Sequence, residues 1–246
     1  RVGPGTLVAL NVSARDRLAQ IDLNLERERW APRDTAPDRI EVNIASADLV
    51  YYSGGAPTLT MRTVVGKPTT RTPMFAAAVQ RIVFNPPWTV PGSIARNELL
   101  PRERAHPGYL ASRHVRVVGG QLVQSPGPDA ALGVLKFDFP SPYGVYLHDT
   151  PNHSVFRADN RAVSHGCVRL DEPRALAVAL LSRQGWSAAQ VAAGIAAGRT
   201  RAVALDQPMP VLVAYRTAAA GEDGAVRFHR DVYGWDARLA RTLAGM

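Results

Sequence analysis

The chain has 246 residues, a formal net charge of +8 and a sequence pI near 10.2. This length is enough for one substantial core, or for one domain with an inserted subdomain. Hydrophobic residues make up 46% and charged residues 20%, which is typical of a globular protein. No apolar run approaches the roughly 20 residues that cross a bilayer. The scattered arginines favour an ordinary basic surface over a nucleic-acid-binding stripe.

The first expected element is a helix that begins after Ser13, in a capping-box-like sequence. Apolar residues then recur at helical spacing: Leu18, Ile21 and Leu25. Pro32 ends this helix. We therefore assign residues 1–34 to a lead-in linker and helix, and residues 35–246 to the main domain. The opening Arg1-Val2-Gly3-Pro4-Gly5 is unlike a signal peptide, and we interpret it as an internal cut in a longer protein.

The rest of the chain alternates strand and helix signals. Strands are expected over residues 39–45, 49–53, 58–65, 79–84, 133–139, 144–148, 202–205, 211–217 and 225–232. Gly54-Gly55 predicts a hairpin turn between the second and third strands, and residues 66–73 form a turn-rich loop. Helices are expected after the N-caps Asp171 and Ser187, and over residues 235–243.

Residues 85–124 interrupt this pattern. The segment is irregular and rich in proline, with a short helix candidate over residues 93–100 and a small hairpin around Gly119-Gly120. A segment this long without regular structure is unusual inside a compact domain, and such segments are often lids. Trp88 either anchors the base of this insert or packs in a core.

The chemistry concentrates around the only cysteine, Cys167, in Ser164-His165-Gly166-Cys167. His148 lies upstream. A cysteine nucleophile needs a base and a pair of donors for the developing oxyanion. A histidine from a neighbouring element can be that base. Gly166 allows close approach of a substrate carbonyl, so the N–H groups of Gly166 and Cys167 are candidate oxyanion donors.

Two other interpretations of this cluster remain open at this point. A single cysteine is more often a small buried hydrophobe than a nucleophile, but serine, histidine and glycine are poor packing partners for an inert thiol. A zinc site from His148, His153, His165 and Cys167 lacks the paired spacing of the usual ligand motifs. One cysteine also excludes an internal disulfide.

A histidine, about fifteen residues and then Ser/Thr-His-Gly-Cys resembles the signature of the L,D-transpeptidases, the YkuD-type catalytic domain. Further segments between about Asn24 and Asp236 resemble the larger, YcbB-like Gram-negative branch: Asn85-Pro86-Pro87-Trp88, Pro107-Gly108-Tyr109-Leu110, Lys136-Phe137 and Tyr146-Leu147-His148-Asp149-Thr150-Pro151. The resemblance implies a β-rich α+β catalytic domain in which residues 85–124 form a capping subdomain over the active site.

The resemblance also implies roles for individual residues. Cys167 matches the nucleophile, and His148 matches the base, whose imidazolium would stabilise the thiolate. Ser164, His165 and Gly166 match the residues that support the signature. Tyr146 and Arg169, with Trp88, are candidates for substrate binding, with a core position or a structural ion pair as the alternative. Asp149 receives no catalytic role, although its carbonyl is placed to orient His148.

The implied reaction is acyl transfer between peptidoglycan stem peptides in the periplasm of a Gram-negative bacterium. Cys167 attacks the carbonyl of an L-centre, usually of residue three and in some members of residue one, and a neighbouring stem amine takes the acyl group. No metal, nucleotide or nucleic acid is needed. Transfer to water would instead make the protein a peptidoglycan L,D-carboxypeptidase or hydrolase. A non-enzymatic wall-binding module and a nucleic-acid binder are further alternatives.

Overall fold

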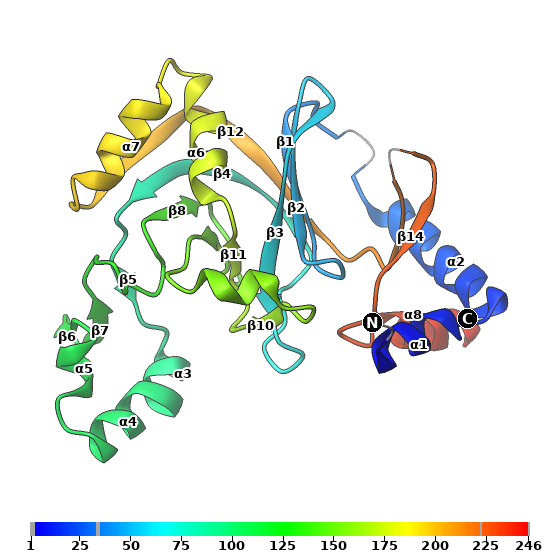
Figure 1. Ribbon diagram of the computed structural model, residues 1–246, viewed down its shortest axis with the longest axis horizontal. Coiled ribbons are helices and arrows are strands. Elements are labelled where there is room, and N and C mark those ends of the chain that lie inside the picture. The colour runs from blue at the N-terminus through cyan, green and yellow to red at the C-terminus, as the bar shows by residue number, and fades with distance from the viewer. Residues whose placement is uncertain (1–2, 33–34, 222, 246) are drawn as a thin grey trace.

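The structure is a computed structural model and describes residues 3–32, 35–221 and 223–245. The predicted cut at Arg1-Val2 lies outside the described residues. At the centre is a nine-stranded mixed sheet in the order β10-β3-β11-β9-β8-β4-β12-β1-β2 (Figure 1). Because β2 also pairs with β3, the sheet closes on itself. This confirms the predicted α+β class with a dominant β component.

The strands of the central sheet are β1 (Arg39–Asn43), β2 (Asp48–Ser53), β3 (Ala56–Gly66), β4 (Phe75–Phe84), β8 (Leu135–Asp138), β9 (Leu147–His148), β10 (Ala162–Ser164), β11 (Val168–Leu170) and β12 (Arg201–Ala214). The strands outside it are β5 (Trp88–Thr89), β6 (Val115–Val118), β7 (Gln121–Gln124), β13 (Ala218–Ala220) and β14 (Val226–Phe228). The helices are α1 (Pro4–Leu10), α2 (Ala14–Trp30), α3 (Gly92–Ile94), the π-helix η1 (Ala95–Leu99), α4 (Leu100–Ala105), α5 (Tyr109–Ser112), the 3-10 helix η2 (His153–Arg157), α6 (Pro173–Ser182), α7 (Ala188–Ala196) and α8 (Trp235–Ala244).

One hydrophobic core lies between the sheet and helices α6 and α7. Alternate side chains of β1, β8 and β9 point into it, and Ile40, Phe137 and Leu147 are completely buried. The apolar face of α6 meets them through Leu176 and Leu181. This packing leaves the other side chains of β9 and β11 free to form a polar site, because neighbouring residues of a strand point to opposite faces.

Several predicted elements differ in their boundaries. The two strands expected over residues 202–205 and 211–217 are one strand, β12, which pairs with β4 across an irregularity between Ala204 and Met209. The prolines in that stretch prevent regular pairing there without ending the strand. The first helix after the signature begins at Pro173 with Glu172 as N-cap, rather than Asp171. Asp171 instead forms an ion pair with Arg62.

Residues 85–124 form a body of their own at one end of the molecule (Figure 1). A three-stranded sheet in the order β5-β7-β6 lies beside α3, η1, α4 and α5. Its small core consists of Val90, Leu99, Val115 and Leu122. Gly119 and Gly120 both have positive φ and close the predicted hairpin.

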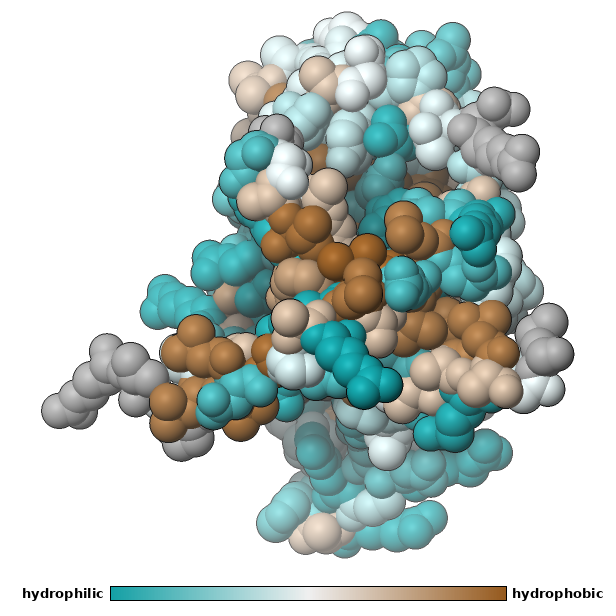
Figure 2. Space-filling view, turned by 90° about the vertical axis from the view of Figure 1, so that its right-hand side faces the viewer, coloured by the Kyte–Doolittle hydropathy of each residue, from teal (hydrophilic) through white to brown (hydrophobic). Residues whose placement is uncertain are grey.

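The lead-in helix α2 packs through its polar face. Ser13 caps it as predicted, its hydroxyl accepting from the Asp16 N–H. Leu18 and Leu25, however, are 59% and 55% exposed, whereas Asn24 is buried. The predicted apolar stripe therefore faces outward. Figure 2 shows that side of the molecule, where apolar side chains lie among hydrophilic ones.

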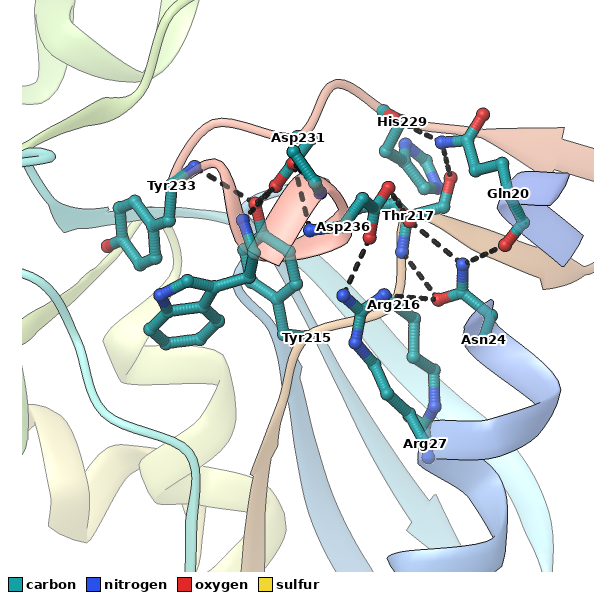
Figure 3. A network of polar contacts seen from close by, with 12 residues as sticks. Gln20, Asn24, Arg27, Tyr215, Arg216, Thr217, His229, Asp231, Tyr233 and Asp236 are labelled. Atoms are coloured by element: carbon teal, nitrogen blue, oxygen red, sulfur yellow. Dashed lines mark hydrogen bonds and ion pairs between the residues drawn. The ribbon is translucent and has the colours of Figure 1, made fainter. Parts of the chain in front are cut away.

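The buried face of α2 joins a polar network with the C-terminal segment (Figure 3). The Asn24 side chain donates to the Thr217 hydroxyl at 2.8 Å and accepts from the Thr217 N–H at 2.8 Å. Arg27 forms an ion pair of 2.6 Å with Asp236 at the start of α8. These contacts dock α2 on the main domain and explain why its polar face is the buried one.

Within the described residues, none of the helices combines the length and the hydropathy that a membrane-spanning helix needs.

Candidate active site

The catalytic signature forms a tight turn between β10 and β11. Ser164 is buried, and its hydroxyl donates to the Cys167 carbonyl at 2.6 Å while accepting from the Gly166 N–H at 3.0 Å. Gly166 has a φ of +120°, a conformation that L side chains rarely adopt. Ser164 and Gly166 therefore shape the turn that presents Cys167.

This geometry corrects one sequence expectation about the oxyanion donors. The Gly166 N–H is already bonded to Ser164, so it is not free to receive an oxyanion. Among the hydrogen bonds of the described chain, none is donated by the backbone N–H of His165 or Cys167. Those two N–H groups are the backbone donors that the turn leaves unengaged.

The thiol of Cys167 lies against Tyr146, its neighbour on the adjoining strand. The Val168 N–H donates to the Tyr146 carbonyl at 3.1 Å, which sets this register. Burial raises the pKa of the thiol, while the backbone N–H and hydroxyl of Tyr146 lower it, as do the charges of Lys136 and Arg169. The thiol also donates to the Gly144 carbonyl at 3.9 Å. The net shift is upward, so the resting site holds a protonated thiol.

His148 occupies the next position on the same face of β9. Its ring lies 5.5 Å from the Tyr146 ring, and its Nδ1 lies 2.5 Å from the Asp149 carbonyl. That carbonyl orients the ring, as predicted. Burial and then the charge of Arg169 lower the pKa of His148 to about 3. The ring is therefore neutral near pH 7 in the resting site, the form in which an imidazole can accept a proton.

Two cations flank this face. In the sheet register, His148 lies opposite Arg169 on β11 and Lys136 on β8. The Lys136 ammonium lies 4.3 Å from the centre of the Tyr146 ring and 2.9 Å from Asp138. Lys136 and Arg169 supply the positive charge near the sulfur that the neutral His148 does not.

The structure does not join the His148 ring to the sulfur directly. The hydrogen bonds among the described residues include none between His148 and Cys167. In the sheet register His148 lies diagonally across from Cys167, because it pairs with Arg169, two residues further on. His153 lies elsewhere, 3.5 Å from Asp149 and 3.9 Å from Asp171, and its side chain is half exposed. His148, rather than His153, therefore remains the predicted base.

The Arg169 guanidinium lies beside the thiol. Its Nε is buried and has no hydrogen-bond acceptor among the described residues. Burial lowers the pKa of Arg169, and negative charge on Cys167 in its thiolate form opposes this shift. A buried donor without a partner is costly. The arrangement is thus ready to accept an anionic group beside Cys167 and His148.

The insert reaches the site through two residues, Trp88 and Glu98. Trp88 packs on the insert's own core and lies near the Tyr146 hydroxyl, where it opposes the rise in the pKa of Tyr146 that burial causes. The Glu98 carboxylate of η1 lies 2.5 Å from the His165 Nε2. His165 therefore connects the signature turn to the insert.

Sequence reasoning missed Lys136 and Glu98 as site residues. Lys136 carried a signal in its strand, since it belongs to one of the quoted segments, but only the register of β8 on β9 brings it to His148. Glu98 lies in a helix of the insert, and nothing in the local sequence indicates that it meets His165.

The strand neighbours Tyr146 and Cys167, with His148, Arg169 and Lys136 on the same sheet face, form a thiol site in a β-rich α+β domain. The L,D-transpeptidase catalytic domain model, named YkuD, matches residues 37–191, which is more than half of the chain. The chain therefore belongs to this family of cysteine-dependent enzymes.

Individual relatives are similar in sequence or in fold. A Haemophilus influenzae protein described as "Putative L,D-transpeptidase" is 32% identical over 240 residues, covering 89% of this chain and 48% of that protein. The chain thus spans about half the length of the curated relative it matches. The catalytic domain of an E. faecium L,D-transpeptidase acylated by ertapenem has 17% identity and a TM-score of 0.40, covering 74% of this chain and 99% of that one. L,D-transpeptidase 3 from Mycobacterium tuberculosis has 15% identity and a TM-score of 0.38, covering 72% and 61%.

Proposed function

We propose that this protein cross-links peptidoglycan stem peptides through a thioester on Cys167, in the manner of the YcbB-like branch. The observation that carries the proposal is the sheet face on which the half-buried thiol, the neutral His148 and the cations Lys136 and Arg169 adjoin one another. A protonated thiol needs a base, and a neutral imidazole is one.

In the first step, His148 takes the thiol proton as the sulfur bonds to the carbonyl carbon of an L-centre in the donor stem. That centre is usually residue three and in some cases residue one. The backbone N–H groups of Cys167 and His165 receive the oxyanion, which is the largest single contribution in many acyl transfers. The intermediate collapses to a thioester, and His148 returns the proton to the departing amine of the terminal D-residue.

In the second step, the amine of a neighbouring stem attacks the thioester carbonyl. His148 accepts a proton from this amine and delivers it to the sulfur, which restores the thiol as the new amide forms. Lys136 and Arg169 favour the thiolate in both steps because they place positive charge near it. His148 passes on each proton that it accepts, so the site returns to its starting state without a further reactant.

The donor stem carries free carboxylates, and Arg169 is our candidate for binding one of them. Its unpartnered Nε beside the thiol supports this assignment. Tyr146 lies against the sulfur, and Trp88 lies near the Tyr146 hydroxyl. Both side chains would therefore contact the stem next to the scissile bond.

We further propose that residues 85–124 act as a lid. Support comes from their separate core and from their two contacts with the site, Trp88 with Tyr146 and Glu98 with His165. A closed lid excludes water while the thioester waits for its acceptor amine. We also propose that the protein acts in the periplasm of a Gram-negative bacterium; the peptidoglycan substrate and the resemblance to the YcbB-like branch support this.

The test is mass spectrometry of products formed from purified stem peptides by the wild type and by Cys167→Ala. We expect cross-linked dimers from the wild type and none from a folded Cys167→Ala variant. Shortened monomers without dimers, even with excess acceptor, would instead identify a carboxypeptidase. Dimer formation by the folded Cys167→Ala variant would overturn the nucleophile assignment.

A further inference from the structure

The carbonyl side of the catalytic turn is held by the loop that follows β3. Both the Lys67 N–H and the Thr70 hydroxyl donate to the Ser164 carbonyl, at 3.0 and 2.9 Å. The Thr72 hydroxyl donates to the Gly166 carbonyl at 2.8 Å and accepts from the Gly66 N–H at 2.8 Å. Thr72 is completely buried. Residues 66–72 thus bind the two carbonyls that immediately precede the unengaged N–H groups of the turn.

This loop is fixed in turn by Tyr233, which is 4% exposed. Its hydroxyl donates to the Gly66 carbonyl at 2.5 Å and accepts from the Thr72 N–H at 3.1 Å. One phenol therefore bonds both ends of the loop. Tyr233 lies beyond residues 37–191, the part of the chain that matches the family model.

Tyr233 is itself the end of the polar network that begins at helix α2 (Figure 3). The Tyr215 hydroxyl accepts from the Tyr233 N–H at 2.9 Å and donates to Asp231 at 2.6 Å. Asp231 accepts from the Asp236 N–H at 2.9 Å, and Asp236 accepts from Thr217, the partner of α2. These hydrogen bonds connect helix α2 to the loop through Thr217, Asp236, Asp231, Tyr215 and Tyr233.

A peptide unit is planar, so the carbonyl of one residue and the N–H of the next are oriented together. The Ser164 carbonyl shares its peptide plane with the His165 N–H, and the Gly166 carbonyl shares its plane with the Cys167 N–H. By fixing these two carbonyls, the loop fixes the direction of the two N–H groups that the proposed mechanism aims at the oxyanion. Small errors in that direction are costly for acyl transfer.

We infer that Thr72 and Tyr233 are positioning residues for the oxyanion site: Thr72 orients the Gly166–Cys167 peptide, and Tyr233 holds the loop that carries Thr72. This inference rests on the proposed acyl transfer at Cys167 and adds two residues that never touch substrate. It also makes the C-terminal segment part of the catalytic support.

The test compares two reactions of the same thiol. Acylation by p-nitrophenyl acetate forms an oxyanion as sulfur bonds to the carbonyl carbon and nitrophenolate leaves. Alkylation by iodoacetamide displaces iodide and forms no oxyanion. Loss of a positioning residue should slow acylation alone, whereas general damage to the site should slow both acylation and alkylation. The variants are Thr72→Val, Thr72→Ser and Tyr233→Phe. The control is Tyr51→Phe, which changes a buried phenol on β2 whose side-chain partner is Arg183 and not the loop or Tyr233.

We expect acylation to fall about tenfold or more in Thr72→Val and about threefold or more in Tyr233→Phe, on the scale of losing an oxyanion donor. Thr72→Ser keeps the hydroxyl and should restore the rate. Tyr51→Phe should acylate within about twofold of the wild type, because Tyr51 does not hold the loop. Alkylation should stay within about twofold in all variants, because it forms no oxyanion.

Equal acylation rates in Tyr233→Phe and Tyr51→Phe, or a parallel fall in alkylation, would overturn the inference. If Tyr233→Phe fails to fold, the Thr72 pair decides, since an equal loss in Thr72→Ser and Thr72→Val is incompatible with a role of the hydroxyl. Failure of the proposed function looks different: nitrophenolate release would then be the same in the wild type and in Cys167→Ala.

Discussion

The catalytic turn is held from two sides, and the two sides differ in burial. On the inner side, Thr72 and Ser164 are buried and their hydroxyls bond backbone groups of the turn. On the outer side, the Glu98 and His165 side chains are 35% and 36% exposed. Loss of a buried partner typically costs about 1–3 kcal/mol, whereas an exposed ion pair contributes about 0–1 kcal/mol.

This difference separates two tasks. The inner contacts fix the geometry of Cys167 and its neighbouring N–H groups, and they are too costly to break during turnover. The outer contact with the insert is weak enough to open and close. On this account, the proposed lid moves without disturbing the turn, as the proposed reaction with two successive substrates requires.

The largest expected effect is on the inner side, at Gly66. A Cβ added there would lie 2.1 Å from the Thr70 carbonyl oxygen and 2.7 Å from the Thr72 nitrogen, both backbone atoms. Gly66→Ala should therefore displace the loop and lower the free energy of unfolding by about 3 kcal/mol. Chemical denaturation measures it. Gly127→Ala is the control, since a Cβ there meets no atom within 4 Å. Equal stability of the two variants would show that the loop is not tightly held.

The second effect is a pH dependence of stability from His148. Its folded pKa of about 3 lies below the ordinary value of 6.5, so below pH 6.5 the unfolded chain binds a proton that the folded protein does not. This stabilisation is fully present above pH 6.5 and is lost as the pH falls toward 3. We expect a slope of up to about 1.4 kcal/mol per pH unit in this window.

The contribution of His148 is isolated by comparing denaturation of the wild type and His148→Gln across the same window. Carboxylates such as Glu41, whose pKa is lowered by Arg39 and Arg216 despite its burial, contribute to both curves equally. The variant should show the shallower slope. Identical slopes would mean that the imidazole titrates near its ordinary value and is not held neutral by burial.

The smallest effect on stability is expected on the outer side. Glu98→Gln weakens the contact with His165 and should change the free energy of unfolding by less than about 1 kcal/mol. The ratio of cross-linked to hydrolysed product should nevertheless fall, by at most about fivefold, because the lid opens more often.

The control for this prediction is Glu26→Gln, which removes an ion pair with Arg29 on α2, away from the insert. It should leave the product ratio unchanged. The lid assignment fails if both variants give the ratio of the wild type while the Glu98→Gln variant is folded. A fall in both would point to a general charge effect instead.

Much of the fold was open to prediction because its signals are local. The turn residues Gly54-Gly55 predicted the β2–β3 hairpin, and Ser187 was predicted as the N-cap of α7, where the structure adds a capping box with Gln190. The signature predicted that His148 and Cys167 belong to one site, and the register of β9 on β11 puts His148 opposite Arg169, two residues after Cys167. Periodicity, turn chemistry and a motif were enough for these.

The features that escaped prediction depend on partners far along the chain. The polar face of α2 is buried because Asn24 meets Thr217, 193 residues away. The role of Tyr233 follows from a contact with Gly66, 167 residues away. No local pattern encodes such pairings, since they arise only when the sheet closes.

The central claim is that Cys167 carries the acyl group between the two substrates. Intact-protein mass spectrometry after mixing the wild type with a donor stem peptide, without acceptor, tests it most directly. We predict an adduct whose mass is that of the donor acyl group after loss of the terminal D-residue. Peptide mapping should place it on Cys167, and addition of an acceptor stem should remove it as dimer forms. Dimer formation without any adduct, or an adduct on another residue, would contradict the account.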